Sequence, residues 1–442
     1  MTPTHARTST VGSQAVKDGH REFLFPCAPP YYQDPIVLAE GRGLEVVDAD
    51  GRTYLDFFSG ILTTGIGHCH PEVVDRVREQ LGTLGHTSTM YLTEPQVEYA
   101  RRLAAIAPGT LRKSFFTNSG TEAVETAIML ASMYTGRSEI IALRLGYSGR
   151  SVLATNLTAH HAWRPLASGI AGITHVQAPY PYRCPFKTPC DEGCLDKFGD
   201  DLEEAILTTT NGKPAAFFAE TVLGVGGFVV PPPGYFQRAA EIIRSHGGVF
   251  IADEVQAGFG RTGTHWFGIE HWGVEPDIMV MAKTIANGMP LGATIAKAEI
   301  ADAWTAKTIS TFGGNPITMA AAIATNDVMV REEVPRRSAE RGAQLRSGLD
   351  ALALEHEWMG EVRGLGLMLA VEVVADRESR KPAPDLAKTF HEAAKAEGLL
   401  VGLAGLYGQV IRLAPSMLIT EVQVAEGLSR LSRAADAVSA SR

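Results

Sequence analysis

The sequence contains few cysteines, few aromatic residues and no long apolar segment. Five cysteines among 442 residues are too few for the disulfide framework of a secreted scaffold, and they favour a reducing cytoplasm. No apolar run reaches the roughly 18 residues that a membrane-spanning helix needs. The first residues, MTPTHARTSTVGSQ, lack the apolar core of a signal peptide. We therefore expect a cytoplasmic protein with no membrane association.

Basic residues are also fewer than acidic residues. The chain has 40 Lys and Arg against 49 Asp and Glu, a formal net charge of −9. Nucleic acids and anionic membranes attract clustered positive charge, so neither is an expected partner. At roughly 150 residues per domain, the length predicts two or three domains. This composition is most typical of an ordinary soluble enzyme.

Three of the five cysteines, Cys184, Cys190 and Cys194, lie close together in the segment PYRCPFKTPCDEGC. One interpretation is a thiolate metal site, but C-x-x-C pairs are absent and no fourth ligand is evident. The alternative is a proline-rich loop whose thiols have no function. We therefore expect no metal.

The order of apolar runs and turns predicts an α/β protein. Residues 1 to about 40 are polar and proline-rich and are expected to form an irregular arm, and Asp50-Gly51 between two β-favouring runs predicts a hairpin. From about residue 80 to 330, helical stretches alternate with short apolar runs, which indicates a mainly parallel sheet covered by helices. The charged stretch REEVPRRSAERG then marks a change to strand-like runs, GLMLAVEVV and GLLVGLA among them. We predict an N-terminal arm and hairpin (1–80) that join a C-terminal small α+β domain (333–442), and a large domain (81–332).

Four buried runs of the large domain end in side chains that can bind a ligand. They lead to Tyr147, Glu220, Asp253 and Lys283. In open α/β sheets, ligands bind beyond the carboxyl ends of the strands. We expect these four side chains to converge on one cleft.

Lys283 has two interpretations, because a lysine after a buried strand must be paired or neutralised. It forms an ion pair with Asp253, or it is a nucleophile that forms a Schiff base with a carbonyl. Lys283 alone favours the ion pair. Asp253 precedes it by 30 residues, the length of one βαβ crossover. An acidic partner for a pyridine nitrogen beside a Schiff-base lysine is the arrangement that binds pyridoxal phosphate.

A phosphate group would also need a binding site. In FFTNSGTEAVETAIMLA, Ser119 and Glu122 match a capping box, and Gly120 lets an anion approach the first N–H groups of the helix. The alternative is simply a well-capped helix. Thr311, in STFGGNPITMAAA, either donates a hydroxyl to the phosphate or lies in an ordinary loop before a helix with proline in its first turn.

Two further residues each have two possible roles, and the flanking sequence does not decide between them. Tyr147 either lies flat against an aromatic ring or packs in the core. Arg412 stands between Ile411 and Leu413. It therefore lies on an edge face, or it binds a carboxylate through two parallel N–H donors.

Taken together, these motifs resemble the class III pyridoxal-phosphate aminotransferases, the ω-aminotransferase family. The resemblance runs from DADGRTYLDFFSG and GHCHPEV to IRLAPSM, and includes in order NSGTEA, IADEVQAGFGRTG, AKTIANGMPLGA, TFGGNP and VRGLGLM. Within the family, FFSGI, GHCHPEV, HTST and RLAPSM are most similar to the alanine–glyoxylate type. The resemblance implies fold type I: a large domain with a mainly parallel sheet of seven strands, and a small α+β domain built from both termini.

The resemblance also implies roles for single residues. Lys283 would hold the cofactor as a Schiff base (an aldimine) and then move the proton during ping-pong transamination. Asp253 would bind the pyridine nitrogen, and Arg412 the substrate carboxylate. Other cofactor contacts would come from Ser119, Gly120, Thr121, Tyr147, Glu220, Val255, Gln256 and Thr311. Since Thr311 would reach the cofactor of the partner subunit, a homodimer, or a tetramer made from it, is implied.

The sequence departs from the family pattern in one informative place. Relatives that use glutamate commonly carry a second glutamate that masks the substrate arginine, but here Val225 occupies that position. This favours a small 2-oxo acid such as pyruvate or glyoxylate as acceptor, with alanine or a β- or ω-amino acid as donor. Racemases and amino-alcohol-phosphate phospholyases share the scaffold and remain alternatives, as does an inactive relative that only binds.

Overall fold

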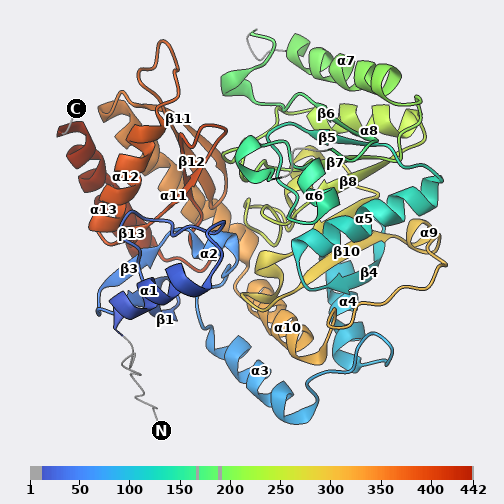
Figure 1. The fold of residues 1–442 in the computed structure, drawn as a ribbon, viewed down its shortest axis with the longest axis horizontal. Coiled ribbons are helices and arrows are strands. Elements are labelled where there is room, and N and C mark those ends of the chain that lie inside the picture. The colour runs from blue at the N-terminus through green and yellow to red at the C-terminus, as the bar shows by residue number, and fades with distance from the viewer. Residues whose placement is uncertain (1–11, 166–168, 188–191, 441–442) are drawn as a thin grey trace.

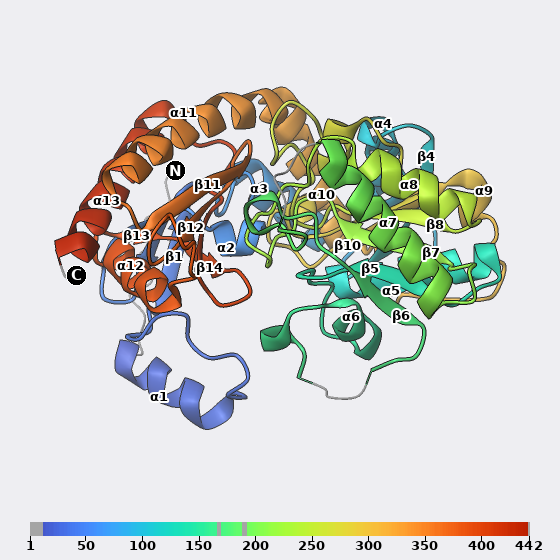
Figure 2. The ribbon, with the colours of Figure 1, turned by 90° about the horizontal axis from the view of Figure 1, so that it is seen from above.

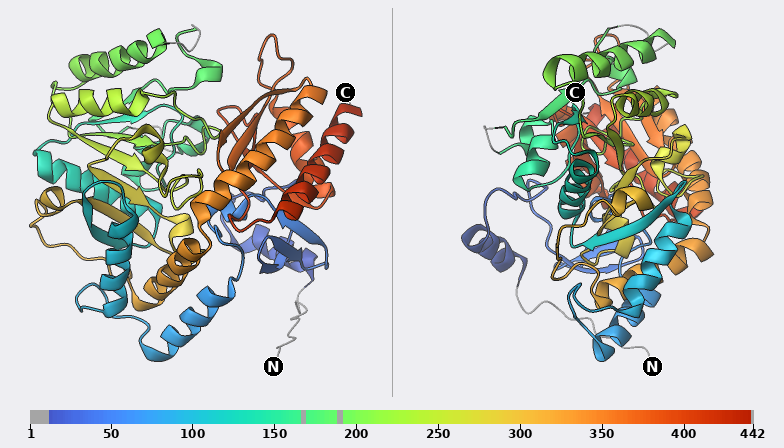
Figure 3. Two further views of the ribbon diagram at one scale, coloured as in Figure 1. Left: turned by 180° about the vertical axis from the view of Figure 1, so that it is seen from behind. Right: turned by 90° about the vertical axis from the view of Figure 1, so that its right-hand side faces the viewer.

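The structure is a computed structural model that describes residues 12–165, 169–187 and 192–440. A large seven-stranded sheet with helices around it forms one part of the molecule, and two four-stranded sheets lie in a smaller part (Figure 1). The C-terminal helices lie beside the N-terminal strands when the molecule is seen from the front and from behind (Figures 1 and 3).

The large sheet has the strand order β4-β10-β9-β8-β7-β5-β6. Its strands are β4 (Leu111–Thr117), β5 (Ile140–Leu143), β6 (Ile173–Val176), β7 (Ala216–Glu220), β8 (Val249–Asp253), β9 (Ile278–Met281) and β10 (Gly292–Lys297). Strands β6, β5, β7, β8 and β9 run parallel, whereas β10 is antiparallel to both of its neighbours. The predicted mainly parallel sheet is therefore confirmed, with one reversed strand near its edge.

Helices cover both faces of this sheet, which explains why its strands are apolar along their whole length. In β8, Ile251 packs on one face with α5 (Gly120–Thr135), while Phe250 packs on the other face with α8 (Tyr235–Ser245). Helix α6 (Val152–Leu157) lies on the same side as α5, and Figure 2 shows it across the strands from α8.

The smaller part contains strands from both ends of the chain. One sheet has the order β1-β2-β3-β13, and the other the order β11-β12-β15-β14. Their strands are β1 (Leu38–Arg42), β2 (Glu45–Asp48), β3 (Thr53–Asp56), β11 (Met359–Leu365), β12 (Met368–Val373), β13 (Leu399–Leu400), β14 (Gly402–Ala404) and β15 (Val410–Leu413). Because β13 pairs with β3, the two chain ends share a sheet, as expected. The domain boundaries near residues 80 and 332 stay a prediction.

Three local expectations have different outcomes. The hairpin is confirmed, since β2 and β3 pair antiparallel around Gly51, whose φ is +85°. The run GLLVGLA is not one strand but two, in different sheets. The chain bends closely over Phe58, and a Cβ on Gly402 would lie 2.4 Å from that ring. The N-terminal arm, expected to be irregular, contains helix α1 (Ser13–Phe23), which stands apart from the body in Figure 2.

The other helices complete the layers around the three sheets. They are α2 (Ser59–Leu62), α3 (Pro71–Thr83), α4 (Glu94–Ile106), α7 (Glu192–Thr209), α9 (Ala298–Ala301), α10 (Pro316–Arg331), α11 (Val334–Glu355), α12 (Pro384–Ala396) and α13 (Glu421–Ala440). Within the described part of the chain, none of the helices combines the length and apolar character needed to cross a membrane.

Candidate active site

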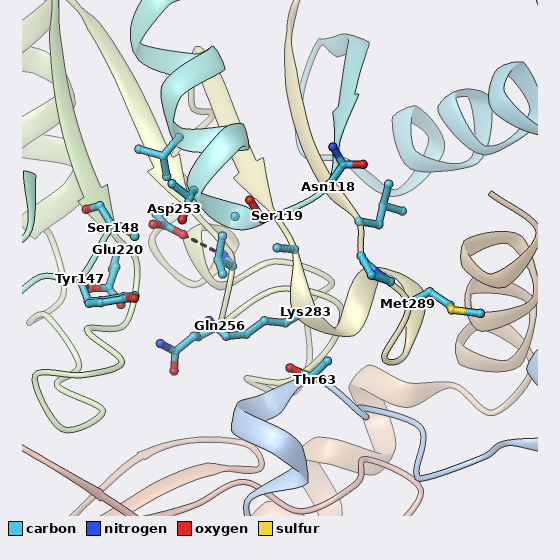
Figure 4. A pocket seen from close by; sticks show the side chains of 18 of the residues that line it. Thr63, Asn118, Ser119, Tyr147, Ser148, Glu220, Asp253, Gln256, Lys283 and Met289 are labelled. Carbon is cyan, nitrogen blue, oxygen red and sulfur yellow. Dashed lines mark hydrogen bonds between the residues drawn. The ribbon is translucent and has the colours of Figure 1, made fainter. Parts of the chain in front are cut away.

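The four side chains expected to converge do so at the carboxyl ends of adjacent strands. Strands β9, β8, β7 and β5 are neighbours, and Glu220 and Asp253 stand side by side in register. Figure 4 shows the labelled side chains around one cavity of about 280 Å³. Nine predicted site residues line it: Ser119, Gly120, Thr121, Tyr147, Glu220, Asp253, Val255, Gln256 and Lys283.

Lys283 begins a short 3₁₀ helix directly after β9 and is half-buried. Its φ of +55° is uncommon for a residue with a side chain, and such strain concentrates at functional sites. Among the described residues the amine has no hydrogen bond or ion pair, so the ion pair with Asp253 considered from the sequence is absent. Burial lowers the pKa of Lys283 to about 8, against the opposing attraction of Asp253 and Glu220.

Asp253 is 4% exposed and has one oxygen available. Oδ1 accepts a hydrogen bond of 2.9 Å from the backbone N–H of Val255. Oδ2 has no hydrogen-bond partner in the described parts of the chain. Burial raises the pKa of Asp253, opposed by the Val255 N–H and by Lys283. A carboxylate held in this way can accept a bond from a cationic N–H group of a bound molecule.

Both carboxylate oxygens of Glu220 accept hydrogen bonds from backbone N–H groups, so this side chain holds the backbone around the cavity in position. Its Oε1 accepts from the N–H of Tyr147 and its Oε2 from the N–H of Gly224, both at 2.8 Å. The carbonyl of Gly224 in turn accepts from Arg412 at 3.3 Å. Burial, and then the neighbouring Asp253, raise the pKa of Glu220. This link between two strand ends and a distant arginine could not be inferred from sequence spacing.

The buried carboxyls predict how stability depends on pH. Glu220, Asp253 and Glu254 have pKa values raised by burial, Glu254 to about 8. The folded chain therefore holds protons that the unfolded chain releases near its ordinary carboxyl pKa, and the stability that these carboxyls contribute falls as pH rises across that interval. Burial lowers the pKa of His271 and of His391 to about 4, and these two groups act in the opposite direction below about pH 6.5. We therefore expect the unfolding free energy of the cofactor-free protein to decrease from about pH 6.5 to about pH 8.

Replacing Glu220 by Gln should make that decline shallower, because one of the three titrating groups is removed. Urea unfolding of the wild type and Glu220→Gln at several pH values measures the two slopes. Equal slopes for the two proteins would show that Glu220 titrates normally.

The N-terminus of α5 forms one wall of the cavity. Ser119 caps the helix, its Oγ accepting from the N–H of Glu122 at 3.3 Å. Glu122 returns the bond to the N–H of Asn118 at 2.6 Å, one residue earlier than a capping box requires. The predicted helix start is confirmed. First-turn N–H groups of a helix have no intrahelical acceptor, and together with the helix dipole they attract an anion.

Several cavity residues were not among the predicted site residues. Thr63, Asn118, Ser148 and Met289 also line the wall. The loop with Thr63 is held in place from the segment after Lys283, because the hydroxyl of Thr284 donates to the carbonyl of Leu62 at 2.8 Å. The shared motif AKTIANGMPLGA was the available signal, but it did not indicate which parts of the chain it contacts.

Arg412 lies outside the residues that line this cavity, in an inner strand of the small part. This inner, buried position does not agree with an edge face for Arg412. Arg412 is 5% exposed, and its guanidinium donates to the carbonyls of Gly224 and Leu403 and lies over the rings of Phe58 and Phe228. It has no carboxylate partner in the described residues, and its Nε is buried without any hydrogen bond. Burial lowers the pKa of Arg412.

Thr311 and the cysteine cluster lie elsewhere. Thr311 is exposed, in the segment between α9 and α10, and is not among the residues lining the cavity. Cys190 falls outside the described residues. No group of three metal-binding side chains occurs in residues 12–165, 169–187 and 192–440, so the metal interpretation of the three cysteines is untested.

The residues present fit pyridoxal phosphate. The group needs an anion site, a partner for its ring nitrogen and an amine for its aldehyde. Here the α5 N-terminus, the unoccupied oxygen of Asp253 and the unpaired amine of Lys283 line the same cavity. The buried Oε1 of Gln256 has no hydrogen-bond partner among the described residues, which leaves that amide for a polar atom of a bound molecule.

Comparisons with known proteins agree with this geometry. Residues 27–435 match the family model for class-III aminotransferases. Alanine–glyoxylate aminotransferase 2 homolog 2, mitochondrial, from Arabidopsis thaliana is 40% identical over 404 residues, which is 91% of this chain and 83% of the relative.

The chain is also similar to solved structures of transaminases. The amine transaminase from an uncultivated Pseudomonas species, in the PLP-bound (internal aldimine) form, has a TM-score of 0.87 and 32% identity, covering 93% of this chain and 97% of that chain. The thermostable (S)-enantioselective omega-transaminase from Thermomicrobium roseum has a TM-score of 0.90 and 33% identity, covering 97% and 99%.

Proposed function

The chain belongs to the class-III aminotransferase family, and we propose that it transfers an amino group from alanine or a β- or ω-amino acid to a small 2-oxo acid. As a class-III aminotransferase it is an enzyme that uses pyridoxal phosphate for transamination. The proposed acceptor is pyruvate or glyoxylate. The name of the Arabidopsis relative is consistent with this pair of substrates.

One observation carries the acceptor assignment: Arg412 is buried with no carboxylate partner in the described part of the chain. Val225, in the neighbouring loop, supplies no negative charge that would compete with a substrate. Its carbonyl instead accepts from the N–H of Gly405 at 3.0 Å, which ties this loop to the small part. A buried guanidinium whose hydrogen bonds go only to neutral groups is stabilised further by a carboxylate that enters the site.

The proposed roles of the chain follow from the site's charges. Once bound, pyridoxal phosphate supplies the electron sink that stabilises a carbanion at the substrate carbon. Asp253 accepts the N–H of the ring nitrogen and keeps it protonated. Lys283, with a pKa of about 8, takes up and releases the substrate proton near neutral pH. Tyr147 and Val255 line the cavity and are proposed to pack on opposite faces of the ring.

The remaining contacts hold the cofactor in position. Ser119, Gly120 and Thr121 at the start of α5 bind the phosphate. Gln256 donates to the phenolic oxygen of the ring. Glu220 keeps Tyr147 and Gly224 in place through its two backbone hydrogen bonds, so its contribution to cofactor binding is indirect.

Removing the guanidinium tests the acceptor site. We expect Arg412→Ala to raise KM for pyruvate and glyoxylate about 10- to 100-fold, because a charge-assisted bond to a carboxylate contributes about 1.5–3 kcal/mol. Cofactor absorbance should be retained. Arg412→Lys keeps the charge but loses the paired N–H donors, so its KM should lie between those of the wild type and Arg412→Ala. Steady-state kinetics give both values, and an unchanged KM in Arg412→Ala would remove this residue from the site.

The reaction itself is tested by a half-reaction without acceptor. Mixing the holoenzyme with an amino donor should convert one equivalent of cofactor to pyridoxamine phosphate per active site. A panel of donors, measured by absorbance and chromatography, then identifies the preferred one. Turnover of the donor without pyridoxamine phosphate would favour a racemase or a lyase on the same scaffold.

The proposed active unit is a homodimer, or a tetramer made from it, with Thr311 contacting the phosphate in the partner subunit. Two observations support this. Thr311 is exposed beside Phe312, which is 59% exposed. The segment Met90–Leu92 is also apolar and 67–94% exposed, and such patches mark interaction sites. Sedimentation velocity of the holoenzyme measures the assembly, and a fully active monomer would contradict it.

A cytoplasmic location also stays a proposal. The exposed, unbridged thiols of Cys27 and Cys69 suit a reducing compartment. The Arabidopsis relative is named mitochondrial, so fractionation of the source cells is the deciding measurement.

A further inference from the structure

We propose that Cys184 and Cys194 form a thiol pair that low-molecular-weight disulfides, such as oxidised glutathione, convert to an intramolecular disulfide. The two Sγ atoms are 3.7 Å apart, which is sulfur–sulfur contact distance. Moving each sulfur by a little under 1 Å would bring the pair to the roughly 2.05 Å of a disulfide bond. Neither residue has a part in the proposed transamination.

The two cysteines differ in exposure in a way that suits stepwise exchange. Cys184 follows the short 3₁₀ helix Pro181–Arg183 and is partly exposed, so a dissolved disulfide can reach it. Cys194 lies at the start of α7, is 1% exposed and packs in the core with Phe198. It can reach Cys184 but is shielded from larger reagents.

The exchange balances without any other reactant. The thiolate of Cys184 attacks one sulfur of oxidised glutathione, giving a mixed disulfide and releasing one glutathione thiolate. The thiolate of Cys194 then attacks Sγ of Cys184, displacing the second glutathione thiolate. Two protein thiols are oxidised, one glutathione disulfide is reduced to two thiols, and the protons pass to solvent and the leaving thiolates.

The position of the pair determines what the bond would join. Arg183, next to Cys184, donates through Nε to the buried Glu372 of β12 at 2.7 Å, and Tyr180 donates to the other oxygen of Glu372 at 2.6 Å. The segment 180–184 is thus anchored to the smaller part of the molecule, and the disulfide would fix the start of α7 to it. Neither cysteine lines the Lys283 cavity, so we expect kcat to stay within about twofold on oxidation.

Mapping of disulfides in the oxidised holoenzyme tests the proposal. The protein is incubated with oxidised glutathione, digested without reduction and analysed by mass spectrometry. We expect a peptide pair joined through Cys184 and Cys194, restored to two thiols by reductant. The exposed Cys27 and Cys69 are internal controls and should carry glutathione adducts instead. Alkylation of Cys184 by iodoacetamide should slow at least tenfold after oxidation.

A matched variant separates this pair from the third nearby cysteine. Cys190→Ser should still form the Cys184–Cys194 bond, whereas Cys194→Ser should leave Cys184 as a glutathione adduct. A bond that involves Cys190 in the wild type, or a stable glutathione adduct on wild-type Cys184, would overturn the proposal. So would one equivalent of bound zinc that is lost in Cys194→Ser, since that result would identify a metal site.

Discussion

Replacing Lys283 by alanine is expected to lower kcat for transamination by about 10⁴-fold or more, because nucleophile and proton carrier are lost together. Lys283 is the one amine among the residues that line the cavity in the described part of the chain. No neighbouring group can replace it. The contacts proposed for Asp253 and the α5 N-terminus remain, so the variant should still bind the cofactor. Single-turnover and steady-state assays measure the loss.

A matched control separates catalysis from general damage. Lys213 is exposed and does not line the cavity, so Lys213→Ala should keep wild-type kcat. Small primary amines added to Lys283→Ala should restore part of the activity, since they can carry the proton. Turnover above a tenth of the wild-type rate in Lys283→Ala, without added amine, would contradict the proposed role.

The second large effect is expected for Asp253→Asn, a change that keeps the size of the side chain. We expect kcat to fall about 10²- to 10³-fold, the range found when one preorganised electrostatic contact is removed. An amide cannot hold the ring nitrogen protonated, so the ring withdraws electrons less strongly. The hydrogen bond from the N–H of Val255 can persist in the variant. Steady-state kinetics measure the fall in kcat, and the pH dependence of cofactor absorbance reports the loss of the proton on the ring nitrogen.

The adjacent Glu254 is a suitable control for that variant. It is fully buried, but its oxygens accept from the N–H groups of Gly268 and Ile269 at 2.8 and 2.7 Å, and it does not line the cavity. Glu254→Gln should therefore lower stability with little effect on kcat. If Asp253→Asn kept kcat within threefold of wild type, Asp253 would not be the partner of the ring nitrogen.

Strand positions and strand-end residues could be predicted because they depend on local pattern. Continuous apolar runs such as IMVM before Lys283 and VFIA before Asp253 indicate buried parallel strands, and parallel strands place their carboxyl ends at one edge. The hairpin at Gly51 and the cap at Ser119 were likewise local signals. These local patterns are sufficient to predict most of the residues of the proposed site.

Other features depend on distant contacts and could not be predicted. The reversed direction of β10 is set by its pairing with β4 and β9. An apolar run indicates a buried strand but not whether that strand is parallel or antiparallel to its neighbours. The alternatives for Lys283 and Arg412 depended on distances that spacing does not give. Helix α1 was missed because its sequence, SQAVKDGHREF, is mostly polar and none of its residues is buried, so it offers few apolar positions from which a helical period can be recognised.

The central claim is that the ε-amino group of Lys283 carries the cofactor covalently. Reducing the holoenzyme with borohydride makes that link permanent, and peptide mapping then locates it. We predict one pyridoxyl group per chain, on Lys283, with none in the Lys283→Ala variant. A label on a different lysine, or a holoenzyme that releases all of its cofactor after reduction, would contradict the claim.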